Sequence, residues 1–311
     1  MARKKIALIG GGQIGGIMAL LAAQKELGDV VMLDIPEKEG VAKGKTLDIT
    51  EAMPLFGTSI SLTGTSDYAD LKGADVTITT AGLPRKPGMS REDLLSTNVK
   101  IISDVATQLK KHCPNAFHII VTNPLDSMVY AFMKITNCPK NMVAGMAGVL
   151  DTGRFCAFVG MELGISPKDV SAPVLGGHGP TMVPLARLAT VGGIPLTELL
   201  SAEKIEAIVD RTRKAGTEIV NLLANGSAYF SPAASALEMA EAFLKDQKRV
   251  LTCAAYLEGE YGINGYFIGV PVVIGAGGVE KVLQVQLTES EKAALMSSLE
   301  AVKKAVAETK L

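Results

Sequence analysis

Residues 5–34 read KIALIGGGQIGGIMALLAAQKELGDVVMLD, in which two short apolar runs flank a glycine-rich turn and a longer apolar segment. The first run predicts a strand at Lys5–Ile9, and the segment after the glycines predicts a helix at Ile14–Leu27. The second run predicts another strand at Val30–Asp34. A strand, a helix and a strand in this order form a βαβ unit, whose two strands lie parallel in one sheet.

The turn between the first strand and the helix has the spacing GxGxxG. Its six residues are candidates for cofactor binding: Gly10, Gly11, Gly12, Gln13, Ile14 and Gly15. Such a turn directs backbone N–H groups and the positive end of the helix toward a diphosphate. Nineteen residues after the last glycine comes Asp34, whose carboxylate can accept both ribose hydroxyls of an adenosine. It would repel a 2′-phosphate, and Ile35-Pro36 follow it instead of an arginine, so the sequence favours NAD over NADP.

The rest of the first half continues this alternation. It predicts helices at Val41–Met53 and Glu92–Lys111 and strands at Ile60–Leu62, Asp75–Thr79 and Phe117–Val121. After about residue 145 the pattern predicts two helices (203–223 and 232–243) and three short strands (249–257, 266–270 and 271–274) in an antiparallel meander. Thr288 and Glu291 form a capping-box pair before a closing helix. We therefore expect an α/β protein with a Rossmann-type, doubly wound parallel sheet over residues 1–145 and an α+β domain over residues 146–311.

The composition limits the classes of protein to which the chain can belong. Its 311 residues are 48% hydrophobic, and 31 basic against 32 acidic residues give a net charge of −1. This balance argues against a nucleic-acid partner and against a disordered chain. The longest apolar run, Ile17–Ala23, is far shorter than the ~20 residues of a membrane span, so we expect no membrane association.

The four cysteines are far apart in the sequence and show no metal-ligand spacing. They are Cys113, Cys138, Cys156 and Cys253. We expect buried free thiols, no metal site and a cytoplasmic protein.

Two of the eight arginines lie in residues 81–91, which read AGLPRKPGMSR and follow a predicted strand. The glycines and prolines of this segment predict a loop. Loops at the carboxyl ends of the strands bind ligands in doubly wound sheets, and a mobile loop can close over them. Arg85 and Arg91 are therefore candidates for contacts to an anionic ligand.

Two further segments place charged residues in unusual settings. Asp151 and Arg154 are three residues apart, so they would share one face of a helix. His178 lies in the segment GGHGP, whose glycines and proline keep the histidine out of a helix. The other two histidines are expected to be structural, because His112 ends a predicted helix and His118 begins a predicted strand.

Six segments, in this order along the chain, resemble the L-malate dehydrogenases of the lactate-dehydrogenase-like group. They are IGGGQIGG (9–16), MLDI (32–35), AGLPRKPGMSRED (81–93), VTNPLD (121–126), LDTGRF (150–155) and GGHGP (176–180). The resemblance covers nearly the whole chain. It implies an NAD-dependent enzyme that interconverts (S)-malate and oxaloacetate, with residues 146–311 as the substrate and catalytic domain.

The resemblance also implies roles for the residues singled out above. His178 would be the general acid/base, and Asp151 would hold its imidazole and stabilise the protonated form. Arg154 would bind the C1 carboxylate of the substrate as a two-pronged pair. Arg91 would polarise the reacting carbonyl oxygen, and Asn123 would hydrogen-bond to the substrate oxygen. The cofactor would be lined by Asn98, Val121, Thr122 and Asn123.

Arg85 bears on the choice of substrate, because lactate dehydrogenases of this group typically carry glutamine at this position. A dicarboxylate supplies a second negative charge for Arg85. A monocarboxylate would leave that arginine unpaired in a closed, dry site, which is costly. The charges therefore favour malate and oxaloacetate. A lactate or other 2-hydroxy-acid dehydrogenase is one alternative, and a non-catalytic NAD-binding module is another. The family forms dimers and tetramers, so we expect a homodimer or homotetramer.

Overall fold

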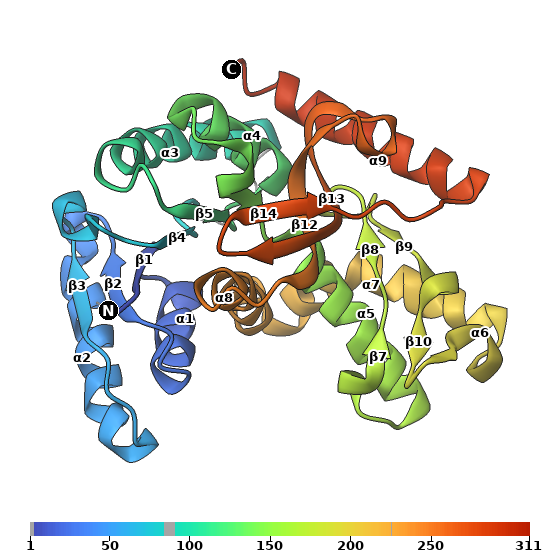
Figure 1. Ribbon diagram of the computed structural model, residues 1–311, viewed down its shortest axis with the longest axis horizontal. Helices are drawn as coiled ribbons and strands as arrows, with labels where there is room; N and C mark the ends of the chain where they lie inside the picture. The colour runs from blue at the N-terminus through green and yellow to red at the C-terminus, as the bar shows by residue number, and fades with distance from the viewer. Residues whose placement is uncertain (1–2, 84–90, 225) are drawn as a thin grey trace.

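The computed structural model describes residues 3–83, 91–224 and 226–311 (Figure 1). In this part of the chain, the strands of the main sheet are β1 (Lys5–Ile9), β2 (Asp29–Leu33), β3 (Leu62–Thr65), β4 (Val76–Thr79), β5 (Phe117–Ile120), β6 (Val143–Gly145), β12 (Arg249–Glu258), β13 (Asn264–Gly275) and β14 (Gly278–Val282). Their spatial order is β14-β13-β12-β6-β5-β4-β1-β2-β3.

The six strands from β3 to β6 form the parallel part of this sheet. They lie in the order β3-β2-β1-β4-β5-β6, which is the strand order of the Rossmann fold. β1 pairs in parallel with β2 on one side and with β4 on the other. The chain order reverses between β1 and β4, and ligands bind at the carboxyl ends of the strands beside such a reversal. The glycine loop follows β1 at this edge, as the sequence predicted.

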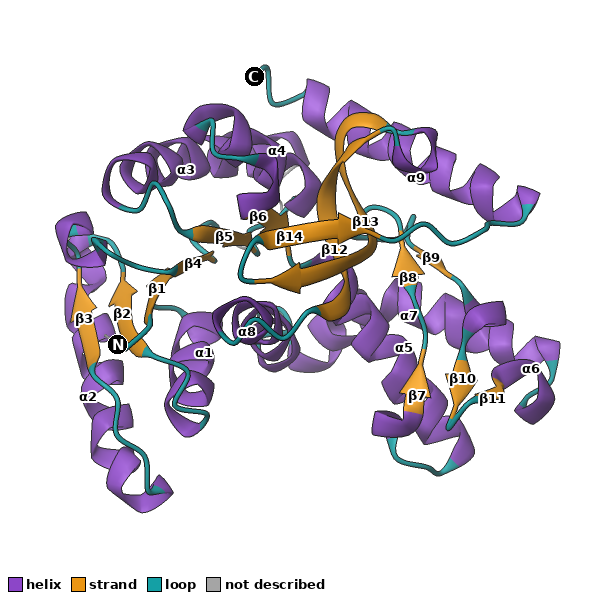
Figure 2. Ribbon diagram, viewed as in Figure 1, coloured by secondary structure: helices purple, strands orange, loops and turns teal. Residues whose placement is uncertain are grey.

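Helices cover both faces of the parallel strands (Figure 2). The described helices are α1 (Gln13–Gln24), α2 (Glu39–Phe56), α3 (Arg91–His112), α4 (Leu125–Thr136), α5 (Ala147–Leu163), α6 (Leu196–Leu199), α7 (Ala202–Leu223), α8 (Phe230–Leu244) and α9 (Glu289–Ala307). Figure 1 shows α3 and α4 above the strands and α1 and α8 below them. The doubly wound architecture expected from the sequence is therefore confirmed.

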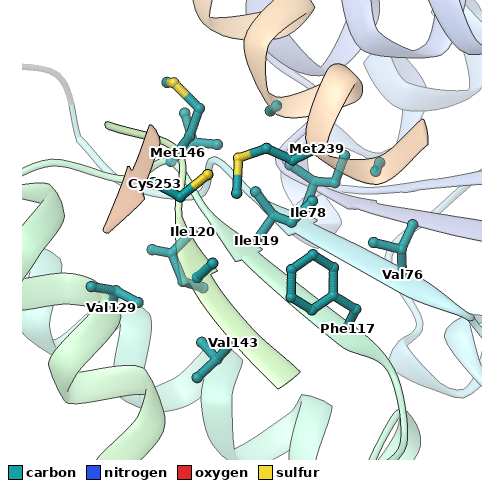
Figure 3. Close-up of a cluster of buried hydrophobic side chains, with 14 of the residues drawn as sticks. Val76, Ile78, Phe117, Ile119, Ile120, Val129, Val143, Met146, Met239 and Cys253 are labelled. Atoms are coloured by element: carbon teal, nitrogen blue, oxygen red, sulfur yellow. The ribbon is translucent and has the colours of Figure 1, made fainter. Parts of the chain in front are cut away.

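The core lies between these two layers of helices. Every residue of β4 and of β5 is buried, as expected for central parallel strands that are covered on both faces. Figure 3 shows the packing around these strands, with Val129 of α4 on one side and Met239 of α8 on the other. Phe117 of β5 stacks on Phe243 of α8 with ring centroids 4.9 Å apart. The closely packed core therefore lies directly behind the carboxyl edge of the strands.

The C-terminal half extends the same sheet with antiparallel strands. β12 pairs with β6 through Ala254 and Gly145, and β13 and β14 continue from β12 as an antiparallel meander. The short strands of this half are β7 (Val170–Ser171), β8 (Val174–Leu175), β9 (Val183–Pro184), β10 (Thr190–Val191) and β11 (Ile194–Pro195). The capping box at the start of α9 is present as predicted. The apolar residues at positions 295, 299, 302 and 306 of that helix are buried, so α9 is fixed to the body of the protein.

Three predicted strands differ from the structure. The strand expected at residues 60–62 is β3 at Leu62–Thr65, which includes Thr63 and Gly64. β3 is the edge strand and pairs only with β2, so its sequence lacks the apolar run of a central strand. The two strands expected on either side of Pro271 are one strand, β13. Pro271 lies opposite Thr252 of β12, and its carbonyl oxygen accepts the N–H of Leu283 directly after β14, so the proline lies within the strand where its pairing with β14 ends.

Candidate active site

His178 lies in the loop between β8 and β9, on the C-terminal half of the chain. The loop is held against the main sheet by Gly176, whose backbone exchanges two hydrogen bonds with Gly269 of β13, at 2.9 and 3.0 Å. The loop is bridged to β13 of the main sheet at Gly176. The residues after Gly176 leave that sheet and place the imidazole of His178 beside α5.

The imidazole of His178 pairs with the carboxylate of Asp151 on α5. Nδ1 of His178 and Oδ2 of Asp151 are 2.8 Å apart, and the side chain of Asp151 is only 2% exposed. With Nδ1–H donating to the carboxylate, Nε2 is the nitrogen that remains for a ligand, and it has no partner among the described residues. The pair therefore has the arrangement of a general acid/base with an orienting carboxylate.

Arg154 binds the other oxygen of the same carboxylate. Its Nη1 donates to Oδ1 of Asp151 at 3.1 Å, from one turn further along α5. The shared helix face predicted for these two residues is therefore present. Nε of Arg154 is buried and has no hydrogen-bond partner within the described ranges, although the side chain is 12% exposed. A buried guanidinium N–H without a partner suits a carboxylate ligand that completes its hydrogen bonding.

The charges around His178 favour its protonated form. Burial lowers the pKa of His178, but the charge of Asp151, the hydrogen bond to Asp151 and the charge of Asp126 act in the opposite direction. The charge of Arg154 lowers the pKa again by a smaller amount, and the net result is a pKa above the ordinary histidine value. The imidazole can therefore hold a proton in the neutral pH range at which a general acid has to work.

The glycine loop leaves the N-terminus of α1 open at the carboxyl end of β1. No side chain in the described part of the chain caps the N-terminus of α1, where Gly12 is the N-cap residue. A Cβ at Gly12 would meet no atom within 4 Å, so space is open beside the first turn. A Cβ at Gly15 would lie 2.1 Å from the carbonyl oxygen of Gly10, so only glycine allows the helix to approach the strand this closely. Uncapped N–H groups beside open space fit the diphosphate of NAD.

Asp34 directly follows β2 and is tied to the loop. Its Oδ2 accepts the backbone N–H of Gly11 at 3.0 Å, and its Oδ1 accepts the N–H of Ile35 at 2.8 Å. The carboxylate is half-buried, so it is positioned by the backbone and still open on one side. This arrangement fits the ribose hydroxyls of NAD, for which Asp34 was selected from the sequence.

Lys45 is a residue of this region that sequence reasoning missed. It projects from α2, and its ammonium group donates to the carbonyl oxygens of Gly11 at 2.8 Å and Gly12 at 2.7 Å. Burial lowers the pKa of Lys45, while the charge of Asp34 opposes that change. No local motif marks this lysine, because its contacts depend on how α2 packs beside the glycine loop.

The residues near the end of β5 form a connected group. Asn98 of α3 is 1% exposed, and its side chain bonds to the backbone of Leu83 and to the carbonyl oxygen of Asn123 at 2.7 Å. Oγ1 of Thr122 donates to the carbonyl oxygen of Ala81 at 2.8 Å. These contacts fix the loop segments on both sides of the candidate cofactor site. The side chain of Asn123 is exposed at this edge, and Val121 is buried beneath it.

Two of the predicted site residues cannot be placed. Arg85 lies outside the described residues. Arg91 is the first residue of α3, and its side chain also lies outside what the structure describes. The convergence of Asp151, Arg154 and His178 is therefore observed, and the contribution of the two loop arginines remains a prediction.

The remaining histidine, cysteine and membrane predictions concern residues away from this site. His118 is buried in β5, where Nδ1 lies 2.7 Å from Oγ1 of Thr77, and burial lowers its pKa to about 4, which fits the structural role predicted for it. All four cysteines are free. In the described ranges, no cluster of three or more metal-ligating side chains could hold an ion, and no helix combines the length and apolar character needed to cross a membrane.

The fold and this arrangement of side chains are those of the dinucleotide-binding dehydrogenases. The family model of the lactate/malate dehydrogenase NAD binding domain matches residues 4–145, and that of the lactate/malate dehydrogenase alpha/beta C-terminal domain matches residues 148–310. The chain belongs to the lactate/malate dehydrogenase family, and its N-terminal half is an NAD-binding domain.

Individual relatives agree with this assignment over the full length of the chain. Malate dehydrogenase 1 of Anaeromyxobacter dehalogenans is 62% identical over 311 residues, which cover 99% of both chains. A malate dehydrogenase of Myxococcus xanthus is also 62% identical, over 99% of this chain and 98% of the relative. Among solved structures, a Cryptosporidium parvum malate dehydrogenase has a TM-score of 0.96 at 49% identity, with 99% of each chain covered. A lactate dehydrogenase of the same organism, solved with lactic acid and the dinucleotide, has a TM-score of 0.96 at 46% identity, covering 100% of this chain and 99% of that one.

Proposed function

We propose that the protein is an NAD-dependent malate dehydrogenase that catalyses the reversible oxidation of (S)-malate to oxaloacetate. The observation that carries this proposal is the buried pair of His178 and Asp151, with Arg154 on the same helix face. A protein that only bound NAD would need the glycine loop and Asp34 but not this pair. The full-length malate dehydrogenase relatives support the same activity.

In the proposed reaction, the glycine loop and Asp34 would hold NAD, which would supply the hydride acceptor for C2 of malate. His178 takes the proton of the C2 hydroxyl on Nε2, and Asp151 stabilises the imidazolium that results. Arg154 holds the C1 carboxylate through the guanidinium N–H groups that Asp151 leaves free. The reverse direction starts from the protonated imidazole, which returns its proton to the oxygen of oxaloacetate.

The two halves of the chain have separate tasks in this proposal. Residues 1–145 would bind NAD through Gly10, Gly11, Gly12, Gln13, Ile14, Gly15, Asp34, Asn98, Val121, Thr122 and Asn123. Residues 146–311 would supply the acid/base pair and the carboxylate clamp. Arg85 would meet the second carboxylate of the substrate, Arg91 would polarise the reacting carbonyl, and Asn123 would also bind the substrate oxygen.

The direct test is oxidation of NADH with a panel of 2-oxo acids that differ in charge and length. We expect oxaloacetate to be reduced with a kcat/KM at least about a hundredfold above that of pyruvate, because an unpaired buried charge costs more than about 3 kcal/mol. A preference for pyruvate would indicate a lactate dehydrogenase. Binding of NADH without turnover of any 2-oxo acid would indicate a non-catalytic module.

We further propose that the enzyme is a cytoplasmic homodimer or homotetramer. The large apolar side chains that are exposed on helices include Leu55 on α2, Met161 on α5 and Leu222 on α7. Leu55 is 87% exposed and Leu222 is 79% exposed. Apolar groups of this size are favourable to bury between subunits. Light scattering coupled to size exclusion measures the molar mass, and a monomer would contradict this part of the proposal.

A further inference from the structure

Asp126 is a buried acid directly beside the loop that carries His178. It is the second residue of α4, in the segment VTNPLD, and it is 9% exposed. Its Oδ2 accepts the backbone N–H of His178 at 2.9 Å. Within the described residues, its other oxygen, Oδ1, is buried and has no hydrogen-bond partner. A buried carboxylate with one unpaired oxygen is costly unless a positive charge nearby compensates for it.

The loop around His178 is closely fitted to Asp126. The N–H of Gly177 donates to Oγ of Ser298 on α9 at 2.8 Å, so consecutive backbone N–H groups are held by two different helices. A Cβ at Gly177 would lie 3.2 Å from Oδ2 of Asp126 and 2.9 Å from Cγ2 of Val302. Only glycine leaves room for this approach. The position of the imidazole is therefore set by contacts from α4 and α9 as well as by Asp151.

Among the described residues, the charged groups that face His178 come from two helices. Asp151 and Arg154 lie on α5, Asp126 lies on α4, and α9 presents the uncharged Ser298. Burial raises the pKa of Asp126 to about 6, and the charge of His178 and its N–H group oppose this rise. The carboxylate is therefore mostly ionised at neutral pH. Of the described charged groups, His178 thus faces two carboxylates and one guanidinium.

We propose that Asp126 is a positioning residue of the acid–base system. One oxygen of its carboxylate fixes the backbone of His178, and its charge stabilises the imidazolium that forms when malate is oxidised. Asp151 orients the imidazole through Nδ1. Asp126 fixes the backbone from which the side chain of His178 projects, and it therefore also determines the position of Nε2. Asp126 is also three residues from Asn123, so one contact couples the cofactor edge of β5 to the acid/base of the C-terminal half. This inference rests on the acid/base role proposed for His178.

The substitution Asp126→Asn separates the two parts of the proposal. Asparagine retains an oxygen that can accept the N–H of His178, but it removes the negative charge. Reduction of oxaloacetate needs protonated His178, so kcat/KM falls as the pH rises through the pKa of that histidine. We expect this fall to begin about half a unit to one unit lower in Asp126→Asn, because a nearby negative charge has been lost. The Kd of NADH should stay within about twofold of the wild-type value, since the variant keeps the diphosphate site.

Two further variants complete the experiment. Asp126→Ala removes the acceptor as well as the charge, and we expect kcat/KM to fall about 10- to 100-fold, because a small displacement of an acid/base group has an effect of this size. Ser298→Ala is the matched control, since it removes the neighbouring hydrogen bond to Gly177 without changing the charge. It should lower the activity without moving the pH at which kcat/KM falls. If Ser298→Ala and Asp126→Asn shift the pH at which kcat/KM falls by the same amount, the position of the loop alone determines that pH. This result would overturn the proposal.

A measurement that needs no turnover distinguishes failure of this inference from failure of the proposed function. The chain has three histidines, and His178→Asn identifies the NMR signal of His178 by its loss. We expect the pKa of His178 measured in this way to be lower in Asp126→Asn than in the wild type. An unchanged pKa together with a wild-type pH profile would overturn the role of Asp126 and leave the dehydrogenase assignment intact. A wild-type protein that does not reduce oxaloacetate would refute the proposed dehydrogenase function. The NMR titration would still test whether the charge of Asp126 raises the pKa of His178.

Discussion

Nδ1 of His178 lies 2.8 Å from Oδ2 of Asp151, and this contact joins the loop after β8 to the first turns of α5. The carboxylate is almost completely buried and also accepts a hydrogen bond from Arg154. Because both of its oxygens have partners, it cannot rotate without losing one of them. The imidazole is therefore held in one orientation, with Nε2 directed away from α5 and available to a substrate.

Replacing His178 by asparagine should abolish turnover and leave the binding of NADH nearly unchanged. Asparagine cannot exchange a proton in the neutral pH range, whereas the glycine loop and Asp34 lie on the other half of the chain. Steady-state rates with oxaloacetate and fluorescence titration with NADH measure the two properties separately. A parallel loss of NADH binding would indicate that His178 has a structural role.

Replacing Asp151 by asparagine should lower kcat for oxaloacetate reduction by about 10²- to 10⁴-fold. The sign of the accompanying pH effect follows from the charge. The charge of Asp151 and its hydrogen bond raise the pKa of His178, so their removal lowers that pKa. Reduction of oxaloacetate needs protonated His178, and the rate of reduction falls as the pH rises through the pKa of that histidine. In the variant this fall should therefore begin at a lower pH than in the wild type. Oxidation of malate needs neutral His178, so the rate of oxidation should begin to rise at a lower pH in the variant as well. A full pH profile in both directions checks this, and a shift upward would contradict the assignment.

Replacing Arg85 by glutamine should reduce the preference for oxaloacetate over pyruvate by at least about tenfold. The variant leaves the second carboxylate of oxaloacetate without a cation and removes an unpaired charge from the complex with pyruvate. The ratio of kcat/KM for the two substrates is the quantity to compare. Lys72→Gln is a suitable control, because Lys72 is an exposed lysine outside the candidate site. Selectivity equal to that of the wild type would remove Arg85 from the substrate site.

Most of the fold could be predicted because its central strands are covered on both faces. The apolar and β-branched residues that dominate β1, β2, β4 and β5 are direct consequences of that burial. β3 was misplaced because an edge strand with one neighbour does not need such a run. The strand β13 was divided at Pro271 because sequence alone does not show where β14 stops pairing. β3 is an edge strand and β13 lies next to the opposite edge, so both differences concern the outer strands of the sheet.

The site could be predicted only where its residues are linked by local spacing. Asp151 and Arg154 share a helix face, and Asp34 follows a strand at a fixed distance from the glycines, so both features are visible in the sequence. Lys45 and Asp126 were missed because their contacts join residues 34 and 52 positions apart. Such contacts arise from the packing of helices against loops, which no local pattern specifies.

Replacing Lys45 by methionine should weaken the binding of NADH by about tenfold. Methionine keeps much of the apolar stem but removes the ammonium group, so the carbonyl oxygens of Gly11 and Gly12 lose a charged donor. Hydrogen bonds to a charged group contribute about 1.5–3 kcal/mol, and 1.4 kcal/mol corresponds to tenfold in affinity. The loss also removes a positive charge near the proposed diphosphate site. Fluorescence titration gives the Kd of NADH, and kcat at saturating NADH should change much less than KM.

Lys43→Met is the matched control for this prediction, because Lys43 lies on the same helix but is exposed, and its ion pair among the described residues is with Glu39 one turn away. It changes the net charge of the protein by the same amount, so any difference between the two variants comes from the position of the charge. Exposed pairs of this kind contribute little to stability, and the Kd of NADH should stay near the wild-type value. Equal affinities in Lys45→Met and Lys43→Met would mean that the glycine loop holds its shape without the ammonium group, and that Lys45 has no part in binding the dinucleotide.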